Sequence, residues 1–569
     1  MKDKFKYLFM AVLICAFVYL GYDRVTATEY IKQGQAEIYI PKEWNSAIAK
    51  SINSKDIGLY IDGKKIEIKS GKAIMDESMT LMLPSGVITE AFGCAVHLYE
   101  GENLLIEKGN VSVSLKIGDV LVNVNESTDL VAVAPLKDDA GVVYVPLDCI
   151  IENFGYTYKW DMLNNQATLM NDNPEERNIP YSYSYAKMGR APKIKNQGYF
   201  GTCWATAALT AIESALLPEE AIELSIDHMS ISNSFNISQY DGGDYSMAIA
   251  YLAAWQGPVY EVDDPSGDGK SDGSLRPVKH IQEVQTIPSK DFETIKKMVY
   301  LYGGVSTSLY TSLNDSYGVS RYYNKETNSY CYIGEAKPNH DVVIVGWDDN
   351  YPKENFNSKL EGNGAFICQN SWGENFGEDG RFYVSYYDTN IGIHNVVYTR
   401  IDSVDNYDDI YQSDLCGWRG NLGYEKESAY FANVYTARSF SELAAVSFYA
   451  TDVDTYYEIA VCHYFNDSSD LNSNTGVLAS GTLNNAGYYT IDLNKSVFLA
   501  PGEKFAIVMY ISTPNSTRPV AVEIATDYKT QSVDITDGEG YISYTGRIWK
   551  NVEEEYNCNL CLKGFTKQK

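Results

Sequence analysis

The run W-A-T-A-A-L-T-A-I-E-S-A-L-L, from Trp204 to Leu217, constrains the fold more than any other segment of this 569-residue chain. It is rich in good helix formers and Pro218 follows it at once, so it predicts a helix that ends there. The run is apolar on most sides, and a helix that is apolar all round is buried in the core of a sizeable domain. The sequence therefore predicts a central helix.

Cys203 directly precedes this run and follows the turn-forming segment Q-G-Y-F-G-T. A thiol at a helix N-terminus lies at the positive end of the peptide dipoles, which lower its pKa and favour the nucleophilic thiolate. Cys203 is therefore a candidate nucleophile.

Two further residues complete a set suited to hydrolysis. His340, in K-P-N-H-D-V-V-I-V-G-W, opens an apolar run of the kind expected for a buried strand, and Asn370, in F-I-C-Q-N-S-W-G, closes another. Both lie far from Cys203 in the sequence, so only the tertiary structure can bring the three together.

The three segments, in this order, resemble the papain-like cysteine peptidases, and the resemblance runs from about Ile179 to about Arg400. It implies that Cys203 attacks the scissile carbonyl, and that His340 first keeps the thiol ionised and then protonates the leaving amine. Asn370 is expected to orient the histidine ring. The resemblance implies no cofactor and no metal.

Gln197 and Trp372 take supporting roles in the same resemblance. Gln197 stands where the family places a side-chain amide that joins the Cys203 backbone N–H in binding the oxyanion; the alternative is an ordinary surface glutamine. Trp372, which we group with the substrate-binding residues, is expected to shield the hydrogen bond between His340 and Asn370 from water.

Three more residues are candidates for substrate binding. Gly242 and Gly243 match a glycine pair whose backbone bonds an extended peptide, an approach that a Cβ would obstruct; the alternative is a plain turn. Asp341 stands where the family usually carries a small apolar residue in the pocket for the second substrate residue before the cut. An acid there would select Lys or Arg, unless it is solvated or paired with a lysine.

The chain departs from the family at one pair of positions. Many members have a disulfide where this chain has Phe200 and Tyr240. Because both partners have changed together, we expect an aromatic contact in place of the bridge.

The N-terminus and the overall charge indicate an exported protein. Lys2, Lys4 and Lys6 precede an apolar stretch and a small-residue cleavage site, which predicts a signal peptide over residues 1–27; an uncleaved membrane anchor is the alternative. The net charge of −29 argues against nucleic-acid partners and for a soluble, self-repelling protein, which we expect to be a secreted or cell-surface monomer.

Residues 28–171 contain an internal repeat. L-P-S-G-V-I-T-E-A-F-G recurs as V-P-L-D-C-I-I-E-N-F-G, and each copy predicts a strand, a proline and a short helix that ends at glycine. The pattern resembles the copper amine oxidase N-terminal-like domain, although His97 is its only histidine and no metal-ligand cluster accompanies it. Its position is that of a pro-segment, so inhibition of the cleft and a spacer role both stay open.

Residues 403–569 show short alternating runs between turn signals, which is a β-sandwich pattern. Their position and the closing C-L-K-G-F resemble the lectin-like domain that follows some bacterial papain-like peptidases. Trp418 and Trp549 are candidates for stacking on sugars of a glycan or cell wall, or else belong to the core.

The expected fold is thus α+β. A small duplicated α/β domain (28–171) and a linker (172–178) precede a two-lobed papain-like domain (179–402) with a helical lobe and a β-barrel-like lobe, and a β-sandwich (403–569) follows. The expected function is an exported endopeptidase that acts on proteins or peptides. A surface adhesion or sugar-binding protein with an inactive peptidase scaffold, and a transpeptidase that uses the same residues, are the alternatives.

Overall fold

The computed structural model describes residues 52–53, 56–69, 71–77, 80–99, 101–109, 111–125, 127–138, 140–161, 165–172, 179–312 and 320–568. Contacts divide the chain into the units Met1–Trp44 and Asn45–Lys569. The expected signal peptide, residues 1–27, and most of the expected linker lie outside the described residues. No helix in the described part of the chain is long and apolar enough to cross a membrane.

The N-terminal region is built from two related strand–helix units. Its elements are β1 (Gly58–Ile61), β2 (Lys64–Ile66), β3 (Ile74–Met75), β4 (Leu81–Pro84), α3 (Ser85–Phe92), β5 (Ala95–Tyr99), β6 (Asn103–Lys108), β7 (Val111–Lys116), β8 (Leu121–Val124), β9 (Ser127–Leu130), β10 (Leu136–Lys137), β11 (Val143–Pro146), α4 (Leu147–Phe154), β12 (Tyr156–Asp161) and β13 (Gln166–Asn171). β4 runs into α3 and β11 runs into α4, and the helices end at Gly93 and Gly155 with φ of 67° and 69°. Glycine adopts this left-handed conformation without steric cost, which explains why both copies of the repeat end on it. β4 and β11 pair antiparallel, so the two copies share one core.

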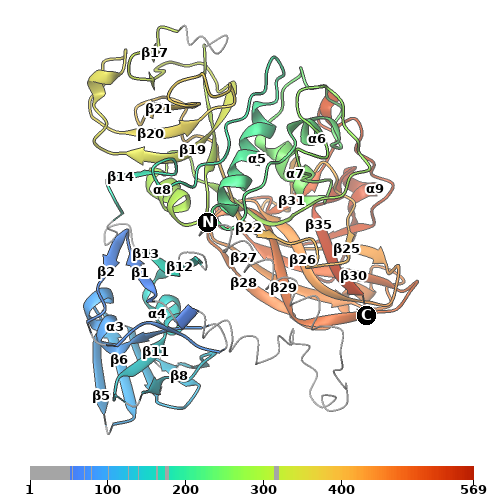
Figure 1. The fold of residues 1–569 in the computed structure, drawn as a ribbon. Coiled ribbons are helices and arrows are strands. Elements are labelled where there is room, and N and C mark those ends of the chain that lie inside the picture. The colour runs from blue at the N-terminus through green and yellow to red at the C-terminus, as the bar shows by residue number, and fades with distance from the viewer. Residues whose placement is uncertain are drawn as a thin grey trace, which may run out of the picture. The chain divides into compact units, whose positions relative to one another are not determined.

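The middle region places its helices before most of its strands. Its elements are β14 (Ser182–Ser184), α5 (Cys203–Leu216), α6 (Ile226–Ile231), α7 (Tyr245–Ala253), β15 (His280–Ile287), α8 (Phe292–Leu301), β16 (Val305–Leu309), β17 (Tyr323–Asn324), β18 (Ser329–Tyr330), β19 (His340–Asp348), η1 (Lys353–Asn355), β20 (Ala365–Gln369), β21 (Arg381–Ser385) and β22 (Asn395–Asp402). The side chains from Trp204 to Ser214 are all buried, which confirms the central helix. α5 packs against α6, α7, β19 and β22, and Figure 1 shows it in green beside the other helices.

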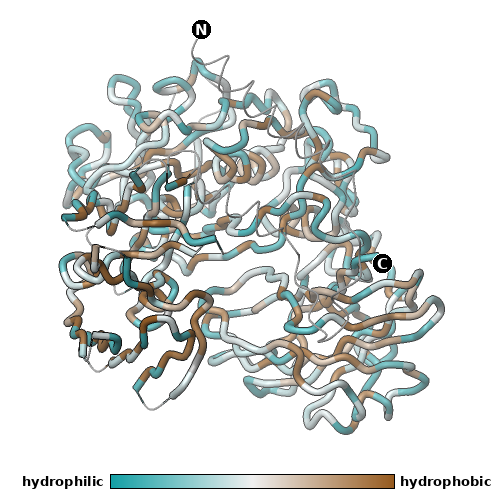
Figure 2. The backbone as a smooth tube through the Cα atoms, turned by 60° about the horizontal axis from the view of Figure 1, so that its bottom comes forward, coloured by the Kyte–Doolittle hydropathy of each residue, from teal (hydrophilic) through white to brown (hydrophobic). Residues whose placement is uncertain are grey.

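The C-terminal region contributes strands to three sheets, two of which pack on each other. Its elements are β23 (Asp409–Tyr411), β24 (Gly420–Leu422), β25 (Ser428–Thr436), β26 (Ser441–Ala450), β27 (Thr455–Cys462), η2 (Asp470–Asn472), β28 (Ala479–Leu483), β29 (Ala486–Leu499), β30 (Lys504–Ser512), β31 (Val520–Glu523), η3 (Tyr528–Thr530), β32 (Gly540–Ser543), β33 (Lys550–Asn551), α9 (Val552–Tyr556), β34 (Asn559–Leu560) and β35 (Leu562–Gln568). Side chains of β26 and β35 share a core with those of β25, β27 and β30, which is the packing of a sandwich. In Figure 2 hydrophobic segments alternate with hydrophilic ones along these strands.

One sheet runs from the middle region into the C-terminal region, which the sequence did not lead us to expect. Its strand order is β17-β18-β21-β20-β19-β16-β22-β15-β29-β26-β35-β23. β15 pairs with β29, where Glu283 lies opposite Tyr489 and Thr286 opposite Ala486. Backbone hydrogen bonds therefore cross the boundary that we expected at residues 402 and 403.

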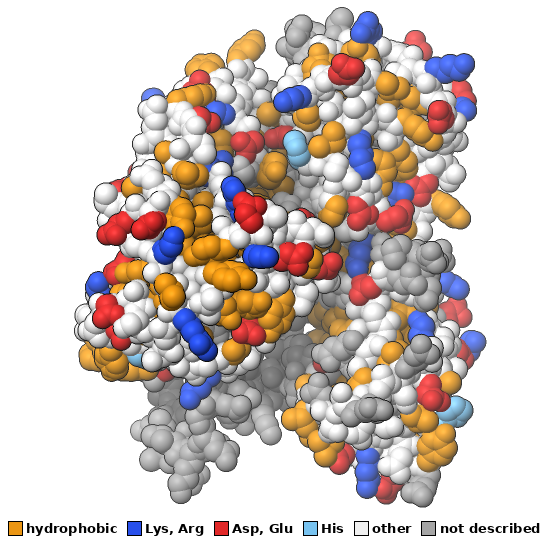
Figure 3. Space-filling view, turned by 180° about the vertical axis from the view of Figure 1, so that it is seen from behind, with side chains coloured by type: hydrophobic (Ala, Val, Ile, Leu, Met, Phe, Trp, Pro, Cys, Tyr) orange, Lys and Arg blue, Asp and Glu red, His pale blue; other side chains and the backbone are white. Residues whose placement is uncertain are grey.

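On the face shown in Figure 3 the acidic side chains are spread out, and red Asp and Glu side chains lie among blue Lys and Arg side chains. Scattered charge of this kind favours solvation.

Candidate active site

Cys203 is the first residue of α5, at the place where the sequence predicts a helix to begin. The backbone N–H groups of Cys203, Trp204 and Asp341 lie near its sulfur and act to lower its pKa. The thiol therefore lies at the helix N-terminus and beside the peptide that follows His340, although the two segments are far apart in the sequence.

We expected the helix N-terminus to lower the pKa of this thiol. In the protein without substrate the pKa is raised instead, so the expected direction is wrong. Burial raises the pKa of Cys203 to about 12, and the carboxylate of Asp341 also acts to raise it. The backbone N–H groups act in the opposite direction and do not offset the loss of water.

His340 and Asn370 are joined by a hydrogen bond. His340 begins β19, Asn370 directly follows β20, and these two strands pair with each other. Nε2 of His340 lies 2.8 Å from Oδ1 of Asn370, so Nε2 is the donor and Nδ1 carries no proton in the neutral ring. Burial lowers the pKa of His340 to about 4.

Trp372 covers the histidine ring. The rings of His340 and Trp372 stack with centroids 4.7 Å apart and planes at 26°, and the Phe376 ring contacts Trp372 in a T-shaped arrangement. His340 and Asn370 are both buried, so their hydrogen bond lies in an environment of low polarity.

Gln197 lies against the segment that carries Asn370. Its backbone N–H donates to the Ser371 carbonyl at 2.9 Å, and the Ser371 hydroxyl donates to Oε1 of Gln197. Nε2 of Gln197 donates to the Phe200 carbonyl at 2.6 Å. The glutamine is therefore held on both sides of its amide and is not a freely solvated surface residue.

Gly242 and Gly243 each have a structural reason to lack a side chain. Gly242 has a φ of 69°, and a Cβ on Gly243 would lie 2.6 Å from Cε2 and Nε1 of Trp204, the residue after the nucleophile. The structure thus requires glycine at Gly243 even in the absence of a substrate peptide.

Asp341 is partly buried and has a side-chain partner. It lies opposite Ser308 in the pairing of β19 with β16, and the Ser308 hydroxyl donates to Oδ1 at 2.6 Å. Burial raises the pKa of Asp341 to about 6, with a further contribution from the carboxylate of Asp244. Within the described residues no ion pair joins Asp341 to a lysine, so the alternative of a lysine partner does not apply there.

The aromatic contact expected in place of the family disulfide is present. The rings of Phe200 and Tyr240 lie with centroids 5.2 Å apart and planes at 53°. The Gly201 N–H also donates to the Gln239 carbonyl at 2.7 Å, so the nucleophile loop and the glycine loop are joined without a covalent bridge.

Residues of the C-terminal region also contact the glycine loop, and these the sequence did not reveal. Nζ of Lys529 lies 3.4 Å from the Gly242 carbonyl, and the Asn236 N–H donates to the Lys529 carbonyl at 2.8 Å. Farther along, Nη2 of Arg419 donates to the Ser246 hydroxyl at 2.8 Å. No local pattern marks such contacts, because they depend on how distant strands pair.

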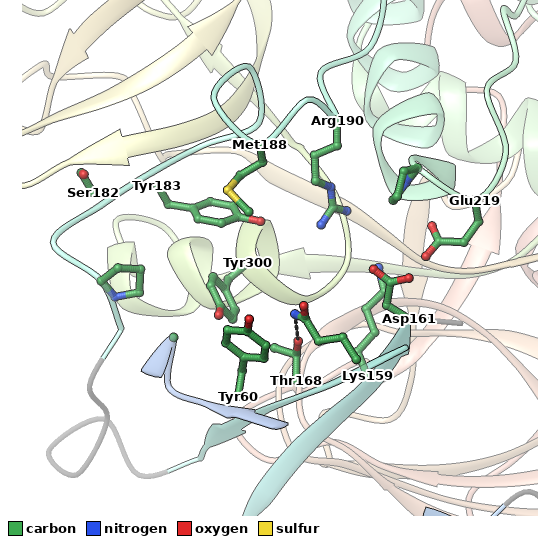
Figure 4. A pocket seen from close by; sticks show the side chains of 14 residues that line it. Tyr60, Lys159, Asp161, Thr168, Ser182, Tyr183, Met188, Arg190, Glu219 and Tyr300 are labelled. Carbon is green, nitrogen blue, oxygen red and sulfur yellow. Dashed lines mark hydrogen bonds between the residues drawn. The ribbon is translucent and has the colours of Figure 1, made fainter. Parts of the chain in front are cut away.

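One pocket lies apart from this site. A pocket of about 330 Å³, shown in Figure 4, is lined by residues that include Lys159, Arg190, Tyr183 and Tyr300, and none of the predicted site residues lines it. Among the described residues, no group of three or more His, Cys, Asp or Glu side chains lies together in a way that could hold a metal ion.

Comparison with known protein families covers all three regions. Residues 179–401 match the papain family cysteine protease, residues 410–566 the lectin-like domain, and residues 60–169 the copper amine oxidase N-terminal domain.

Among known proteins, the chain is similar to a viral cathepsin of the Spodoptera exigua nuclear polyhedrosis virus, with 26% identity over 225 residues. The match covers 38% of this chain and 60% of that protein. Pro-cathepsin H of Mus musculus is 28% identical over 214 residues, which cover 36% of this chain and likewise 60% of that protein. The chain thus spans less than two thirds of the length of these relatives.

The fold is similar to that of a solved clostridial cysteine protease. Cwp84 after propeptide cleavage matches with a TM-score of 0.61 and 28% identity, over 68% of this chain and 99% of that one. A structure of the cysteine protease and lectin-like domains of Cwp84, a surface layer associated protein of Clostridium difficile, matches with a TM-score of 0.59 and 27% identity, over 68% of this chain and 89% of that one. Residues 179–401 are therefore a domain of the papain family of cysteine-type peptidases, joined in one chain to a copper amine oxidase N-terminal domain and a lectin-like domain.

Proposed function

We propose that the chain is an exported endopeptidase that hydrolyses peptide bonds through Cys203, His340 and Asn370. The hydrogen bond from His340 Nε2 to Asn370 Oδ1 carries the proposal, because it leaves Nδ1 as the ring nitrogen that accepts a proton. Cys203 begins α5 and lies close enough to Asp341, the residue after His340, for the two to interact electrostatically.

Burial favours the neutral forms of both groups, since it raises the pKa of the Cys203 thiol and lowers that of the His340 imidazole. His340 is the group that takes the thiol proton as the sulfur attacks. The Cys203 sulfur bonds to the scissile carbon while the thiol proton moves to Nδ1 and the carbonyl electron pair moves to oxygen. Nδ1 then returns that proton to the leaving amine as the C–N bond breaks, and water hydrolyses the thioester.

Gln197 supplies one donor of the oxyanion site. An amide nitrogen carries two hydrogens, and Nε2 of Gln197 gives one of them to the Phe200 carbonyl. The other hydrogen, with the Cys203 backbone N–H at the helix N-terminus, binds the oxygen on which charge develops. Ser371 holds the amide in place through Oε1.

Asp341 selects a basic side chain at the second substrate residue before the cut, and Gly242 and Gly243 bind the backbone of that residue. Support for this comes from the partial burial of Asp341 beside Ser308 and the nucleophile, with no cation paired to it among the described residues. Because its pKa is about 6, the carboxyl group is ionised at neutral pH and attracts Lys or Arg. Equal cleavage of a peptide library with basic and apolar residues at this position would refute the preference.

We further propose that the protein acts as a monomer, either secreted or at the cell surface, with a glycan contact through the C-terminal domain. Support for the location comes from the similar protein Cwp84, which is a surface layer associated protein. Support for the glycan contact comes from the match to the lectin-like domain.

The decisive experiment treats the chain without residues 1–27 with a peptide vinyl sulfone probe. We expect labelling of the unchanged protein, none of Cys203→Ala, and full labelling of Cys462→Ala as the matched cysteine control. Absence of Cys203-dependent labelling, even after trimming to Ile179, would refute the peptidase proposal. Adding a peptide amine during turnover then separates hydrolysis from transpeptidation, because only the latter gives a ligated product.

A further inference from the structure

The outer face of the C-terminal sandwich carries aromatic side chains where a solvent-facing sheet is normally polar. On the three strands β27, β30 and β25, Glu458 lies opposite Tyr510, and Tyr510 lies opposite Tyr430. The rings of Tyr430 and Tyr510 have centroids 4.8 Å apart, and Tyr456 contacts Tyr510 on the same face. These residues form a continuous row across the strands, which we call the tyrosine row.

Tyr430, Glu458 and Tyr510 of the tyrosine row line a groove of about 190 Å³. Two loops, which we call its walls, complete the lining, one with Asn472, Asn474 and Val477 and the other with Gly546 and Trp549. This is smaller than the roughly 300–1,000 Å³ of pockets for drug-sized ligands, so the groove suits one small ring of a longer molecule that continues into solvent.

The row is not part of the hydrophobic core. The inward side chains of the same strands, such as Phe431, Ile459 and Met509, fill the core of the sandwich, while Tyr430 and Tyr510 stay half-buried on the opposite face. Trp549 packs beside a small cluster at one end of the groove, and its indole N–H donates to Asn472 at 3.2 Å, which joins the two walls. Trp418, the other tryptophan that we considered, packs against the main core instead.

The polar side chains of the groove can form hydrogen bonds with the hydroxyl groups of a ligand. The Tyr456 hydroxyl donates to Oε1 of Glu458 at 2.9 Å, so this carboxylate is held in place and its Oε2 can accept a further bond. Asn474 is exposed on the wall, and Ser480 and Ser543 lie at the two ends of the row. No lysine or arginine lines the groove among the described residues, which disfavours a phosphate or carboxylate ligand.

We propose that this groove binds a neutral pyranose ring of a glycan, with one C–H face of the sugar on Tyr430 and Tyr510 and its hydroxyls on Glu458 and Asn474. An aromatic ring can pack against an apolar surface while its polar edge stays hydrated. A pyranose ring has such an apolar C–H face, and its hydroxyl groups project from the edge of the ring. This groove gives the glycan contact of the proposed function a definite site. The proposal rests on that part of the proposed function and does not depend on the peptidase activity.

The test uses the chain from residue 28 onward with Cys203→Ala to prevent self-cleavage. Binding of neutral tetrasaccharides of glucose, mannose, galactose and N-acetylglucosamine is measured by calorimetry and by tryptophan fluorescence. We expect saturable binding of at least one of them and a loss of about tenfold in affinity in Tyr510→Ala, as removal of an aromatic contact produces.

Two further variants keep the test decisive if Tyr510→Ala folds poorly. Val477→Trp, at a wall residue that is 56% exposed, is expected to fill the groove and abolish binding without disturbing the core. Tyr464→Ala, at a residue that is 70% exposed on the same domain and does not line the groove, is the matched control and is expected to bind normally.

Absence of saturable binding by every tetrasaccharide would overturn the proposal, as would binding that survives Val477→Trp or binding of peptides in place of saccharides. The peptide probe distinguishes this failure from failure of the peptidase proposal. With Cys203 intact, the groove variants are expected to label like the unchanged protein.

Discussion

Replacing Gly243 with alanine would place a methyl carbon against the indole of Trp204. The three nearest atoms of that ring would lie at 2.6, 2.6 and 2.9 Å, whereas carbon atoms in ordinary contact are about 3.5–4.0 Å apart. Trp204 is 2% exposed and belongs to the central helix, so it has little room to move. The glycine loop must therefore shift by about 1 Å to reach normal contact distances.

This displacement has two measurable effects. Overpacking of this kind costs about 1–3 kcal/mol, which lowers the melting temperature in a thermal unfolding experiment. A shift of about 1 Å in a loop that binds the substrate backbone is expected to lower kcat/KM by up to roughly 100-fold. We expect a larger loss for peptides that extend along the loop.

A double-mutant cycle with Trp204→Phe tests the cause. The smaller ring makes room for the methyl group, so Gly243→Ala is expected to cost less stability in the Trp204→Phe background, with a coupling of about 0.5–3 kcal/mol. Additive effects of the two substitutions, or a Gly243→Ala protein with unchanged melting temperature and KM, would refute the steric argument.

Three further predictions concern the catalytic groups and the C-terminal core. Asn370→Ala removes the partner of the histidine ring and is expected to lower kcat roughly 10- to 100-fold with little change in KM, as measured by steady-state kinetics. Asp341→Asn removes a carboxylate that raises the pKa of Cys203, so the onset of iodoacetamide alkylation is expected at lower pH. Since the folded pKa of Asp341, about 6, exceeds the unfolded value of about 3.9, the protein loses stability as pH rises between these values, and Asp341→Asn should abolish that loss. Lys563→Met leaves the buried Asp414 without its ion-pair partner and is expected to cost about 3–5 kcal/mol in thermal unfolding.

Each of these predictions has its own contrary outcome. An Asn370→Ala protein with unchanged kcat would contradict a role for the hydrogen bond between His340 and Asn370. An alkylation profile of Asp341→Asn that matches the unchanged protein would contradict the proximity of the two groups. Lys495→Met, at an exposed lysine of the same region, is the control for Lys563→Met and should leave the melting temperature unchanged.

The elements that carry the candidate site could be predicted from local patterns. The apolar run after Cys203, the strand that His340 opens and the glycine ends of the repeat helices all follow from side-chain periodicity and from backbone preferences, and the structure contains each of them. The contact of Phe200 with Tyr240 was also predicted, because the paired loss of two cysteines points to a replacement.

What escaped prediction depends on the environment of a residue rather than on its neighbours in sequence. The helix N-terminus favours a thiolate at Cys203, but burial outweighs it, and burial is a tertiary property. Lys529 contacts Gly242 although 287 residues separate them in the sequence. The reason for glycine at Gly243 is likewise the indole of Trp204, which no spacing rule reveals.

The pairing of β15 with β29 has a consequence for how this chain can be divided. A protein that ended at Asp402 would present β15 as an open strand edge, with unpaired N–H and C=O groups that invite association with other chains. The isolated C-terminal part would expose the matching edge of β29. The two parts are therefore expected to unfold in one transition. If domains are rearranged during evolution, the two regions must be transferred together, or new residues must cover the exposed edges of β15 and β29.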